Sequence, residues 1–190
     1  MILMIVASYV LGAIPNGLIF GKLIWQIDLR RVGSGNIGAT NAWRSIGKTA
    51  GVLIFVLDFL KGAVAVELAR LMIGNEITEV VCGISAIIGH SASVFMGMKG
   101  GKGVATGLGV LTMMMPQVSV IAFLTWLAIV KVTRYVSLGS IVSVWVAVIS
   151  SYLLNMTREY VVFMVLASVL ITVRHASNVK RLLAGKENKV

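Results

Sequence analysis

Residues 1–15 read MILMIVASYVLGAIP, an apolar run without a charged side chain. A helix needs about 20 mostly apolar residues to cross a hydrocarbon layer about 30 Å thick, and the apolar character here continues to Ile24. No basic residue precedes the run, and no small-residue cleavage site followed by a soluble body ends it, as in a signal peptide. The stretch therefore predicts a first membrane-spanning helix that stays in the mature protein.

Similar apolar stretches recur along the whole chain. Of its 190 residues, 58% are hydrophobic and only 13% are charged, and the mean hydropathy is +0.95. A soluble domain of this length is far less apolar. The single Cys82 lies in an apolar stretch, cannot form an intramolecular disulfide, and is more typical of a packing residue than of a nucleophile. The composition predicts an all-α integral membrane protein with one domain, residues 1–190.

The apolar stretches predict seven transmembrane helices, expected near Met1–Ile24, Lys48–Met72, Ile77–Met96, Val104–Met115, Gln117–Val130, Val136–Asn155 and Tyr160–Val173. The fourth and fifth are shorter than an ordinary span. A single proline-kinked helix over both would reverse the orientation of every later span and would put the basic C-terminal tail outside. We therefore prefer a hairpin that turns near Pro116. Either a spanning or a re-entrant hairpin fits this pattern.

The cations alternate between the two sides of this arrangement. One side has only Arg70 and Arg158, and the other has Lys22, Arg30, Arg31, Arg44, Lys48, Lys99, Lys102, Lys131, Arg134, Arg174, Lys180, Arg181, Lys186 and Lys189. The positive-inside rule then places the N-terminus outside and the C-terminus in the cytoplasm. The net charge of +10 lies between apolar spans, not on a soluble basic face, so it argues against nucleic acid and for lipid headgroups or anionic substrates.

Two glycine-rich segments interrupt the apolar pattern, GSGNIGATNAWRSIGK at 33–48 and GMKGGKGVATGLG at 97–109. Backbone amides can approach an anion closely where glycine removes the side chain, and a helix that begins after such a loop adds the positive end of its dipole. By the orientation above, both segments face the cytoplasm. They predict a phosphate site at the membrane surface.

The first segment partly matches two nucleotide-binding motifs. Residues 33–38 fit GxGxxG, with Asp58 about twenty residues later, but Asp58 lies in an apolar helix and no βαβ pattern surrounds the loop. Residues 42–49, AWRSIGKT, lack one glycine of a Walker A motif and precede a transmembrane helix. We therefore reject both motifs. The segment still suits a phosphate, because glycines such as Gly35 let the backbone pass close to an anion. The hydrogen-bond donors would be Ser34, Asn36, Thr40 and Asn41, and Arg44 would bind the phosphate as a planar cation.

The second segment places Lys102 among Gly100, Gly101 and Gly103, directly before a short helix. Their amides, the helix dipole and the lysine form a compact candidate anion site. His90 precedes the segment at the inner end of the third span, where it is a candidate base or hydrogen-bond donor. An ordinary hydrogen-bonding role fits His90 equally well.

Asp58 and Lys61 lie in an apolar helix at i and i+3, on one face. An unpaired charge there would cost several kcal/mol, so the two form a packing ion pair or line the site. Two distant histidines and one cysteine do not suggest a metal centre, and no serine nucleophile elbow is present. We therefore expect neither a metal nor another cofactor.

The motifs together resemble one family, the bacterial acyl-phosphate:glycerol-3-phosphate acyltransferases. The resemblance covers the whole chain and rests on VGSGNIGATNAWRSIGK, LDFLKG, GHSASVFMGMKGGKGVATGLGV, RYVSLGSIV and RHASNVKRLLAGKE. It implies seven transmembrane helices in the bacterial cytoplasmic membrane, with the active site facing the cytoplasm. It also implies transfer of a fatty acyl group from acyl phosphate to the sn-1 hydroxyl of glycerol 3-phosphate, which yields lysophosphatidate and phosphate in the first acylation of phospholipid biosynthesis.

Thioester-dependent glycerolipid acyltransferases carry a histidine and an aspartate separated by four residues. Phe95 follows His90 at that spacing and Lys180 follows His175, so neither histidine has the acid. The resemblance further implies a soluble enzyme that supplies acyl phosphate. No docking patch is evident in the sequence, so transient contact between this enzyme and the chain stays open.

An acyl phosphate has a good leaving group, so we expect direct transfer without an acyl-enzyme. We assign glycerol 3-phosphate to Arg44, Lys102, Ser140, His175 and Asn178, and the two phosphates to the Ser34–Asn41 loop and the amides of 100–103. Either His90 or a substrate phosphate oxygen accepts the hydroxyl proton. The acyl chain is expected between helices, near Phe55, Phe59 and Met96.

Two other function classes fit the sequence less well. A transporter of a phosphorylated anion would explain intramembrane Asp58 and Lys61, but no inverted repeat is evident and the glycine motifs lie on one face. A non-catalytic membrane subunit would leave the density of Ser, Asn, Arg and Lys unexplained.

Overall fold

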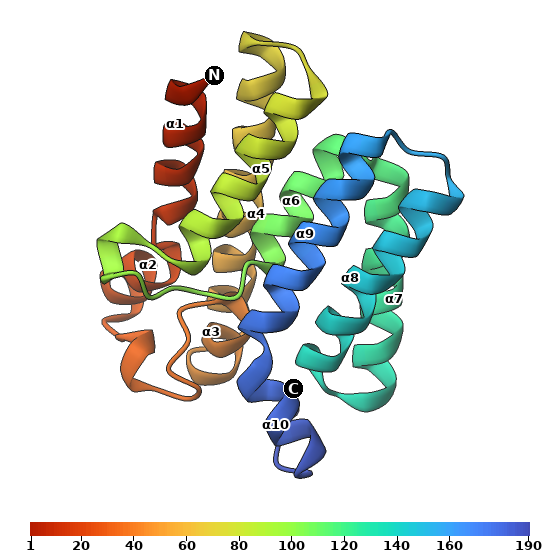
Figure 1. The fold of residues 1–190 in the computed structure, drawn as a ribbon. Coiled ribbons are helices and arrows are strands. Elements are labelled where there is room, and N and C mark those ends of the chain that lie inside the picture. The colour runs from red at the N-terminus through yellow and green to blue at the C-terminus, as the bar shows by residue number, and fades with distance from the viewer. The chain divides into compact units, whose positions relative to one another are not determined.

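The computed structural model describes all 190 residues and contains only helices (Figure 1). Ten α-helices and two 3-10 helices follow the order α1 (Ile2–Ala13), α2 (Asn16–Trp25), η1 (Leu29–Arg31), α3 (Ala39–Ser45), α4 (Lys48–Met72), α5 (Glu76–Ser91), η2 (Val94–Met96), α6 (Val104–Met114), α7 (Pro116–Thr133), α8 (Val136–Leu153), α9 (Arg158–Arg174) and α10 (Ala176–Leu183). The predicted all-α fold is confirmed.

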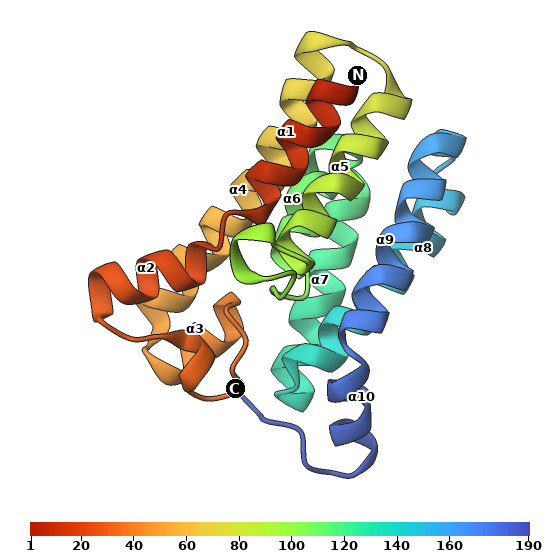
Figure 2. The same cartoon turned by 60° about the vertical axis from the view of Figure 1, so that its left-hand side comes forward.

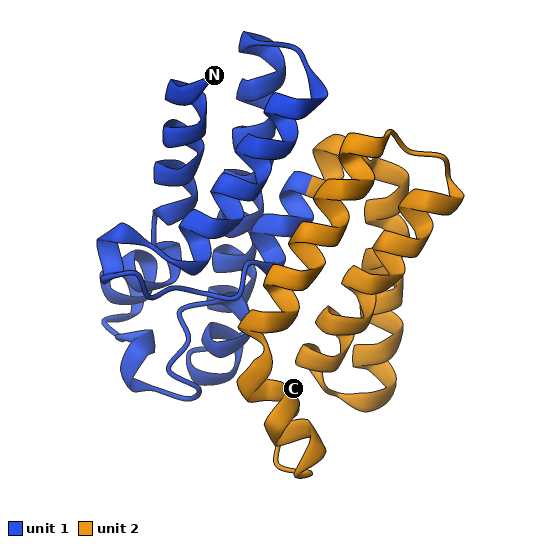
Figure 3. Ribbon diagram, viewed as in Figure 1, with its two compact units in different colours: residues 1–110 blue, residues 111–190 orange.

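The helices form two compact units, residues 1–110 and residues 111–190 (Figure 3). The boundary between them falls inside α6. Unit 1 contains α1 to α5 and both glycine-rich segments, and unit 2 contains α7 to α10.

In unit 1, α5 packs against α1 and α4, and glycines make the α1–α5 contact close. A Cβ atom added at Gly12 would lie 2.1 Å from the carbonyl oxygen of Ala86, and one added at Gly89 would lie 2.2 Å from that of Tyr9. Small residues at helix crossings let two backbones approach, which is the usual basis of helix association in membranes. Alanine at either glycine would force α1 and α5 apart.

The chain breaks after α1 at Ile14–Pro15, and α2 then leads to the first glycine-rich segment (Figure 2). Leu29, Ala42, Ala50 and Ile54 form a buried apolar cluster that joins η1, α3 and α4. This cluster holds the segment against the start of α4 by removing apolar surface from water.

In unit 2, α8 packs between α7 and α9, and α10 contacts both α8 and α9. Gly139 on α8 faces Trp126 and Val130 of α7, where a Cβ would lie 2.9 Å from the Val130 side chain. Pro116 begins α7 directly after the break at Met115, as the sequence predicts. α10 follows α9 at a bend of 60° near His175.

Four helical stretches are long and apolar enough to cross a membrane: Ile2–Trp25, Glu76–Met96, Pro116–Thr133 and Val136–Leu153. The bent pair of α9 and α10 raises the number to five if it forms one span. α6 is apolar but short, and the 25-residue α4 contains the charged residues Asp58, Lys61, Glu67 and Arg70. These lengths and compositions support an integral membrane protein, and the seven crossings and their orientation stay predictions.

Candidate functional site

The first glycine-rich segment is organised by the buried amide of Asn41, which is 3% exposed. Its Nδ2 lies 2.8–3.1 Å from the carbonyl oxygens of Leu29, Val32 and Asn36, and its Oδ1 accepts a hydrogen bond of 2.9 Å from the Ser34 amide. Gly33, at φ +56°, passes so close that a Cβ would lie 2.3 Å from Asn41 Oδ1. The predicted ligand residue Asn41 is therefore committed to the backbone and shapes the loop.

Asn36 and Ser34 occupy the loop that Asn41 shapes. The Asn36 Oδ1 accepts a 2.9 Å hydrogen bond from the amide of Gly38, a local turn that fixes its side chain. Ser34 and Gly35 are exposed, so both can meet a ligand. Thr40 and Arg44 lie on α3, which begins directly after Gly38.

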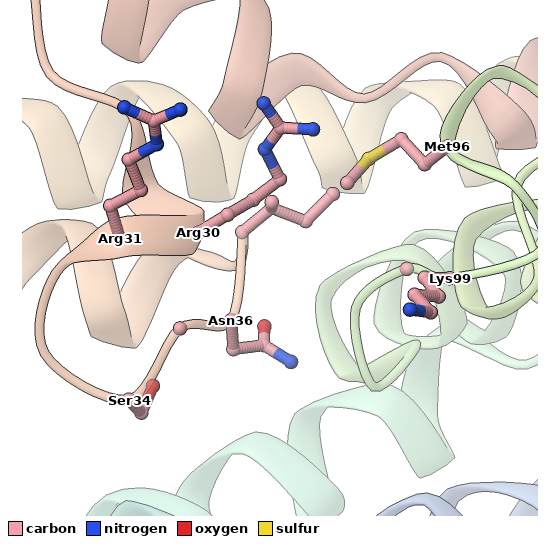
Figure 4. A pocket seen from close by; sticks show the side chains of 9 residues that line it. Arg30, Arg31, Ser34, Asn36, Met96 and Lys99 are labelled. Carbon is pink, nitrogen blue, oxygen red and sulfur yellow. The ribbon is translucent and has the colours of Figure 1, made fainter.

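An open pocket of about 640 Å³ lies between the two glycine-rich segments (Figure 4). Ser34, Gly35 and Asn36 line it from the first segment and Lys99 and Gly100 from the second, and the remaining lining residues are Arg30, Arg31, Ile37 and Met96. Figure 4 shows Met96 and Lys99 on the opposite side from Ser34 and Asn36. Two motifs separated by 48 residues in the sequence thus line one basic hollow.

Asp28 fixes the position of Arg30 at this pocket. The Asp28 carboxylate caps η1 by accepting the Arg30 amide at 3.0 Å, and it pairs with the Arg30 guanidinium at 2.6 Å and with Lys22 at 3.4 Å. The hydrogen bond from Arg30 is the main reason that the pKa of Asp28 falls well below its usual range, and the same bond raises the pKa of Arg30. Both groups are therefore charged at neutral pH.

The second glycine-rich segment packs directly against His90. The Gly101 amide donates to the His90 carbonyl oxygen at 3.0 Å, and a Cβ at Gly101 would lie 2.0 Å from His90 Nε2. A Cβ at Gly100 would lie 2.1 Å from the His90 carbonyl oxygen. Only glycine fits at either position, so the two glycines are required by this packing as well as for any approach of an anion.

Lys102 and Gly103 complete the second segment directly before α6. Gly103 has φ +83°, a left-handed conformation that favours glycine, and α6 begins at Val104. Lys102 is partly buried and makes polar contacts within the structure.

His90 also belongs to a buried polar cluster that the sequence did not reveal. His90 Nδ1 lies 3.7 Å from Asp58 Oδ1, while Asp58 forms an ion pair of 2.9 Å with Lys61. Asn16 donates to Asp58 at 3.0 Å, and Lys61 donates to the Ile14 carbonyl oxygen at 2.9 Å. The cluster is at least 93% buried, and it joins α4, α5 and the break between α1 and α2.

The cluster confirms the ion pair that the i, i+3 spacing of Asp58 and Lys61 predicts. The contact with His90 links two separate helices, α4 and α5, and no short motif indicates it. Asn16 follows Pro15 at the start of α2, and its only sequence signal is a polar residue within an apolar run.

Unit 2 contains the other predicted ligand residues, which lie near the start of α8 and around the junction of α9 and α10. Ser140 lies in the first turns of α8 and donates to the Val136 carbonyl oxygen at 2.9 Å. His175 Nδ1 lies 2.8 Å from the Ile171 carbonyl oxygen. In a neutral ring this contact places the proton on Nδ1 and leaves Nε2 as an acceptor.

Asn178 is held by Glu187, which the sequence did not single out. Glu187 Oε1 accepts from Asn178 at 2.7 Å and from Ser137 at 3.0 Å, and its Oε2 pairs with Arg181 at 2.8 Å. Burial alone would raise the pKa of this carboxyl, but the three donors outweigh burial and lower it. A charged Glu187 thus fixes the side chain of Asn178.

The remaining expectations concern the acyl chain and metals. Phe55 and Phe59 lie together on α4 with ring centroids 6.3 Å apart, and Met96 lines the basic pocket. No group of three or more His, Cys, Asp or Glu residues is arranged to hold a metal ion.

Comparison with known proteins gives concordant matches. The family model described as Glycerol-3-phosphate acyltransferase matches residues 2–185. Relatives named glycerol-3-phosphate acyltransferase include one from Desulforamulus reducens, 40% identical over 100% of this chain and 94% of that protein, and one from Aquifex aeolicus, 44% identical over 98% of this chain and 97% of that protein.

Two crystal structures of PlsY, described as an integral membrane glycerol 3-phosphate acyltransferase, are similar to this chain. Its glycerol 3-phosphate form has a TM-score of 0.95 and 40% identity, over 100% of this chain and 94% of that chain. Its lysophosphatidic acid form has a TM-score of 0.92 and 38% identity, over 99% and 94%.

Proposed function

The chain belongs to the glycerol-3-phosphate acyltransferase family, and we propose that it moves a fatty acyl group from acyl phosphate to the sn-1 hydroxyl of glycerol 3-phosphate. The products are 1-acyl-glycerol 3-phosphate, which is lysophosphatidate, and phosphate. The two crystal structures of PlsY are described as its glycerol 3-phosphate form and its lysophosphatidic acid form. These two compounds match the acceptor and the product of the proposed reaction.

The observation that carries the proposal is the basic pocket at which both glycine-rich segments meet. A reaction between two phosphorylated substrates requires a site that neutralises several negative charges close together. The exposed hydroxyl of Ser34 offers a hydrogen-bond donor, and Lys99 on the other segment offers positive charge. No histidine, cysteine or carboxylate lines the pocket as a nucleophile or as a base for Ser34. This chemistry suits positioning and charge stabilisation of an already activated acyl donor.

We assign glycerol 3-phosphate to the cations Arg44 and Lys102 and to the polar side chains of Ser140, His175 and Asn178. The acceptor hydroxyl attacks the carbonyl carbon of acyl phosphate, the bond from this carbon to the phosphate oxygen breaks, and phosphate departs. Donors around Ser34 and Gly100 stabilise the negative charge that develops.

The hydroxyl proton moves either to His90 or to a phosphate oxygen of a substrate. The structure favours the second acceptor, because His90 is 5% exposed, with Nδ1 toward Asp58 and Nε2 against Gly101. A substrate phosphate oxygen needs no path into this buried cluster.

We place the enzyme in a bacterial cytoplasmic membrane as one functional domain of seven crossings, with the N-terminus outside and the glycine-rich segments in the cytoplasm. The distribution of Lys and Arg supports this orientation. A cytoplasmic site can receive glycerol 3-phosphate and contact a soluble enzyme that makes acyl phosphate. The orientation is tested with single cysteines introduced at Ser34 and Asn75 in a Cys82→Ala background. Intact cells are treated with a maleimide that does not cross the membrane. The predicted orientation requires labelling only at position 75.

The donor is tested with purified protein in lipid, given glycerol 3-phosphate and either palmitoyl phosphate or palmitoyl-CoA. We expect lysophosphatidate and phosphate in equal amounts from palmitoyl phosphate alone, with no loss of activity in a chelator. Transfer from the thioester only would refute the assigned donor. No transfer from either donor by folded protein would instead favour transport of a phosphorylated anion.

A further inference from the structure

The break between α1 and α2 binds side chains from two other parts of unit 1. It runs from Ala13 to Gly17, and the chain changes direction there (Figure 2). A helix that ends leaves its last carbonyl oxygens without partners inside the helix. Here the Ser93 hydroxyl donates to the Ala13 carbonyl oxygen at 2.6 Å, and the Lys61 ammonium donates to that of Ile14 at 2.9 Å. Side chains from α4 and from the residue before η2 therefore hold the break in place.

The first glycine-rich segment packs directly on the start of α2. A Cβ atom added at Gly17 would lie 1.8 Å from the carbonyl oxygen of Ile37 and 3.3 Å from the Leu29 side chain. Gly17 does not have a left-handed φ, so any residue would be allowed by its backbone. Glycine is needed there because the backbone of the segment passes so close to α2.

The preceding residue is connected to the second glycine-rich segment. Asn16 donates to Asp58 Oδ1 at 3.0 Å, and the same oxygen lies 3.7 Å from His90 Nδ1. The His90 carbonyl oxygen accepts the amide of Gly101, and the His90 ring packs against that glycine. Adjacent residues in the first turn of α2 thus contact one segment directly and the other through Asp58 and His90.

We propose that the first turn of α2 sets the spacing of the two glycine-rich segments, with Asn16 and Gly17 as positioning residues for acyl transfer. This inference rests on the proposed function, in which the two segments hold the phosphorylated substrates. Neither residue lines the basic pocket, so both act through the segments. The reacting atoms must lie about 3–3.5 Å apart, and a wrong spacing therefore slows transfer.

The shape of each segment has its own support, which separates shape from spacing. Asn41 holds the first segment through backbone carbonyl oxygens and the Ser34 amide. The bond from the Gly101 amide to the His90 carbonyl oxygen holds the second. Gly17 takes part in neither set of bonds, so a larger residue at this position should move the first segment as one body.

Gly17→Ala tests the spacing in protein purified in lipid. The contact of the new Cβ with the Ile37 carbonyl oxygen must lengthen from 1.8 Å to an ordinary 3.4 Å, a shift of about 1.6 Å. We expect kcat to fall about 100-fold because the geometry of attack is lost. The KM for glycerol 3-phosphate should rise about tenfold, because its proposed ligands Arg44 and Lys102 come from different segments. A loss of folded protein alone would lower kcat and leave this KM unchanged.

The spacing itself is measured by electron paramagnetic resonance between spin labels. Arg31→Cys and Phe95→Cys, both at exposed positions, carry the labels in a Cys82→Ala background. We expect Gly17→Ala to change the mean distance between the labels. Gly21→Ala is the matched control in the same helix, because its Cβ would meet the Ile27 carbonyl oxygen at 3.0 Å and needs only a small shift. This control should keep the distance and the kinetics of the parent protein.

Asn16→Leu tests the second contact without added bulk, and it decides the question if Gly17→Ala does not fold. Loss of the hydrogen bond to Asp58 should lower kcat/KM about tenfold and broaden the distribution of label distances. An unchanged label distance and an unchanged KM for glycerol 3-phosphate in folded Gly17→Ala would overturn the proposal, as would wild-type kinetics and distances in Asn16→Leu. Failure of the wild-type protein to use palmitoyl phosphate would instead reject the proposed function, and the label distances would still report the spacing.

Discussion

Gly101→Ala should disturb the site through a single steric contact. Gly101 does not have a left-handed φ, so alanine is allowed by the backbone. Its Cβ would lie 2.0 Å from Nε2, 2.7 Å from Cε1 and 3.0 Å from Cδ2 of His90, whereas ordinary van der Waals contacts begin at 3.4 Å. The shortest contact must therefore lengthen by about 1.4 Å, and because the ring is 95% buried, the loop must move with it. Overpacking of this kind costs about 1–3 kcal/mol.

The expected consequence is a greater loss of activity than of stability. A displacement of about 1 Å near reacting groups can lower a rate by about 100-fold, because the geometry of attack is lost. We expect Gly101→Ala to melt a few degrees lower than wild type and to lose most of its acyl transfer at saturating substrates. Both are measured on protein purified in the same lipid.

A double-mutant cycle isolates the steric cause. His90→Ala removes the ring that the new Cβ would hit, so adding Gly101→Ala to it should cost almost no further stability. Gly100→Ala is the matched control, because its Cβ would meet the His90 carbonyl oxygen at 2.1 Å, which His90→Ala leaves in place. Additive effects of Gly101→Ala and His90→Ala on melting temperature would refute this reasoning.

Three other substitutions test separate parts of the structure. Asp58→Ala should destabilise the protein by about 3–5 kcal/mol because it strands a buried Lys61, and Asp58→Leu/Lys61→Met should recover most of this loss in thermal melts. Arg44→Ala and Lys102→Ala should each reduce turnover at least 100-fold with near-normal melting, and a parallel loss of expression would indicate a structural role instead. The lowered pKa of Glu187 means that its carboxylate stabilises the fold fully above the unfolded value near 4.5 and loses this effect as the pH falls through the lower folded value. Glu187→Gln should therefore melt lower at pH 7 and lose less stability than wild type between pH 5 and pH 3.

The apolar pattern predicted the long helices closely. The second span was expected over Lys48–Met72, and α4 has these bounds because Gly47 and Gly74 flank an uninterrupted helical run. The first span was expected as one helix, and it breaks at Pro15, where proline removes a backbone donor.

The short helices α3 and α10 were not predicted. α3 has only seven residues and α10 only eight, too few to show a hydrophobic period, and their Ser, Thr, Asn, Lys and Arg residues are typical of loops. Tertiary contacts stabilise these two helices, whose local sequence does not favour a helix. Ala42 of α3 packs into the cluster with Leu29, and Asn178 of α10 is held by Glu187.

The candidate site was predictable where glycine and polar residues share one short segment. The contacts that fix the positions of the site residues were not predictable, because they join segments that the sequence gives no reason to pair. Examples are the contact of Asp58 with His90 and the hydrogen bond from Asn178 to Glu187. The role of Asn41 shows the same limit. Its sequence position predicted a ligand residue, whereas its amide is engaged by three backbone carbonyls and the Ser34 amide.

The buried cluster around His90 explains how the second glycine-rich segment is held in one conformation. Glycine loops lose much backbone entropy on folding, so they need contacts that hold them in place. Here the Gly101 amide binds the His90 carbonyl oxygen, the His90 ring fills the space above Gly101, and Asp58 faces the other edge of that ring. Lys61 and Asn16 in turn fix Asp58. A buried ion pair contributes little net stability, because the cost of removing its charges from water offsets their attraction. The charges of Asp58 and Lys61 therefore hold His90, and through His90 they set the position of the second glycine-rich segment.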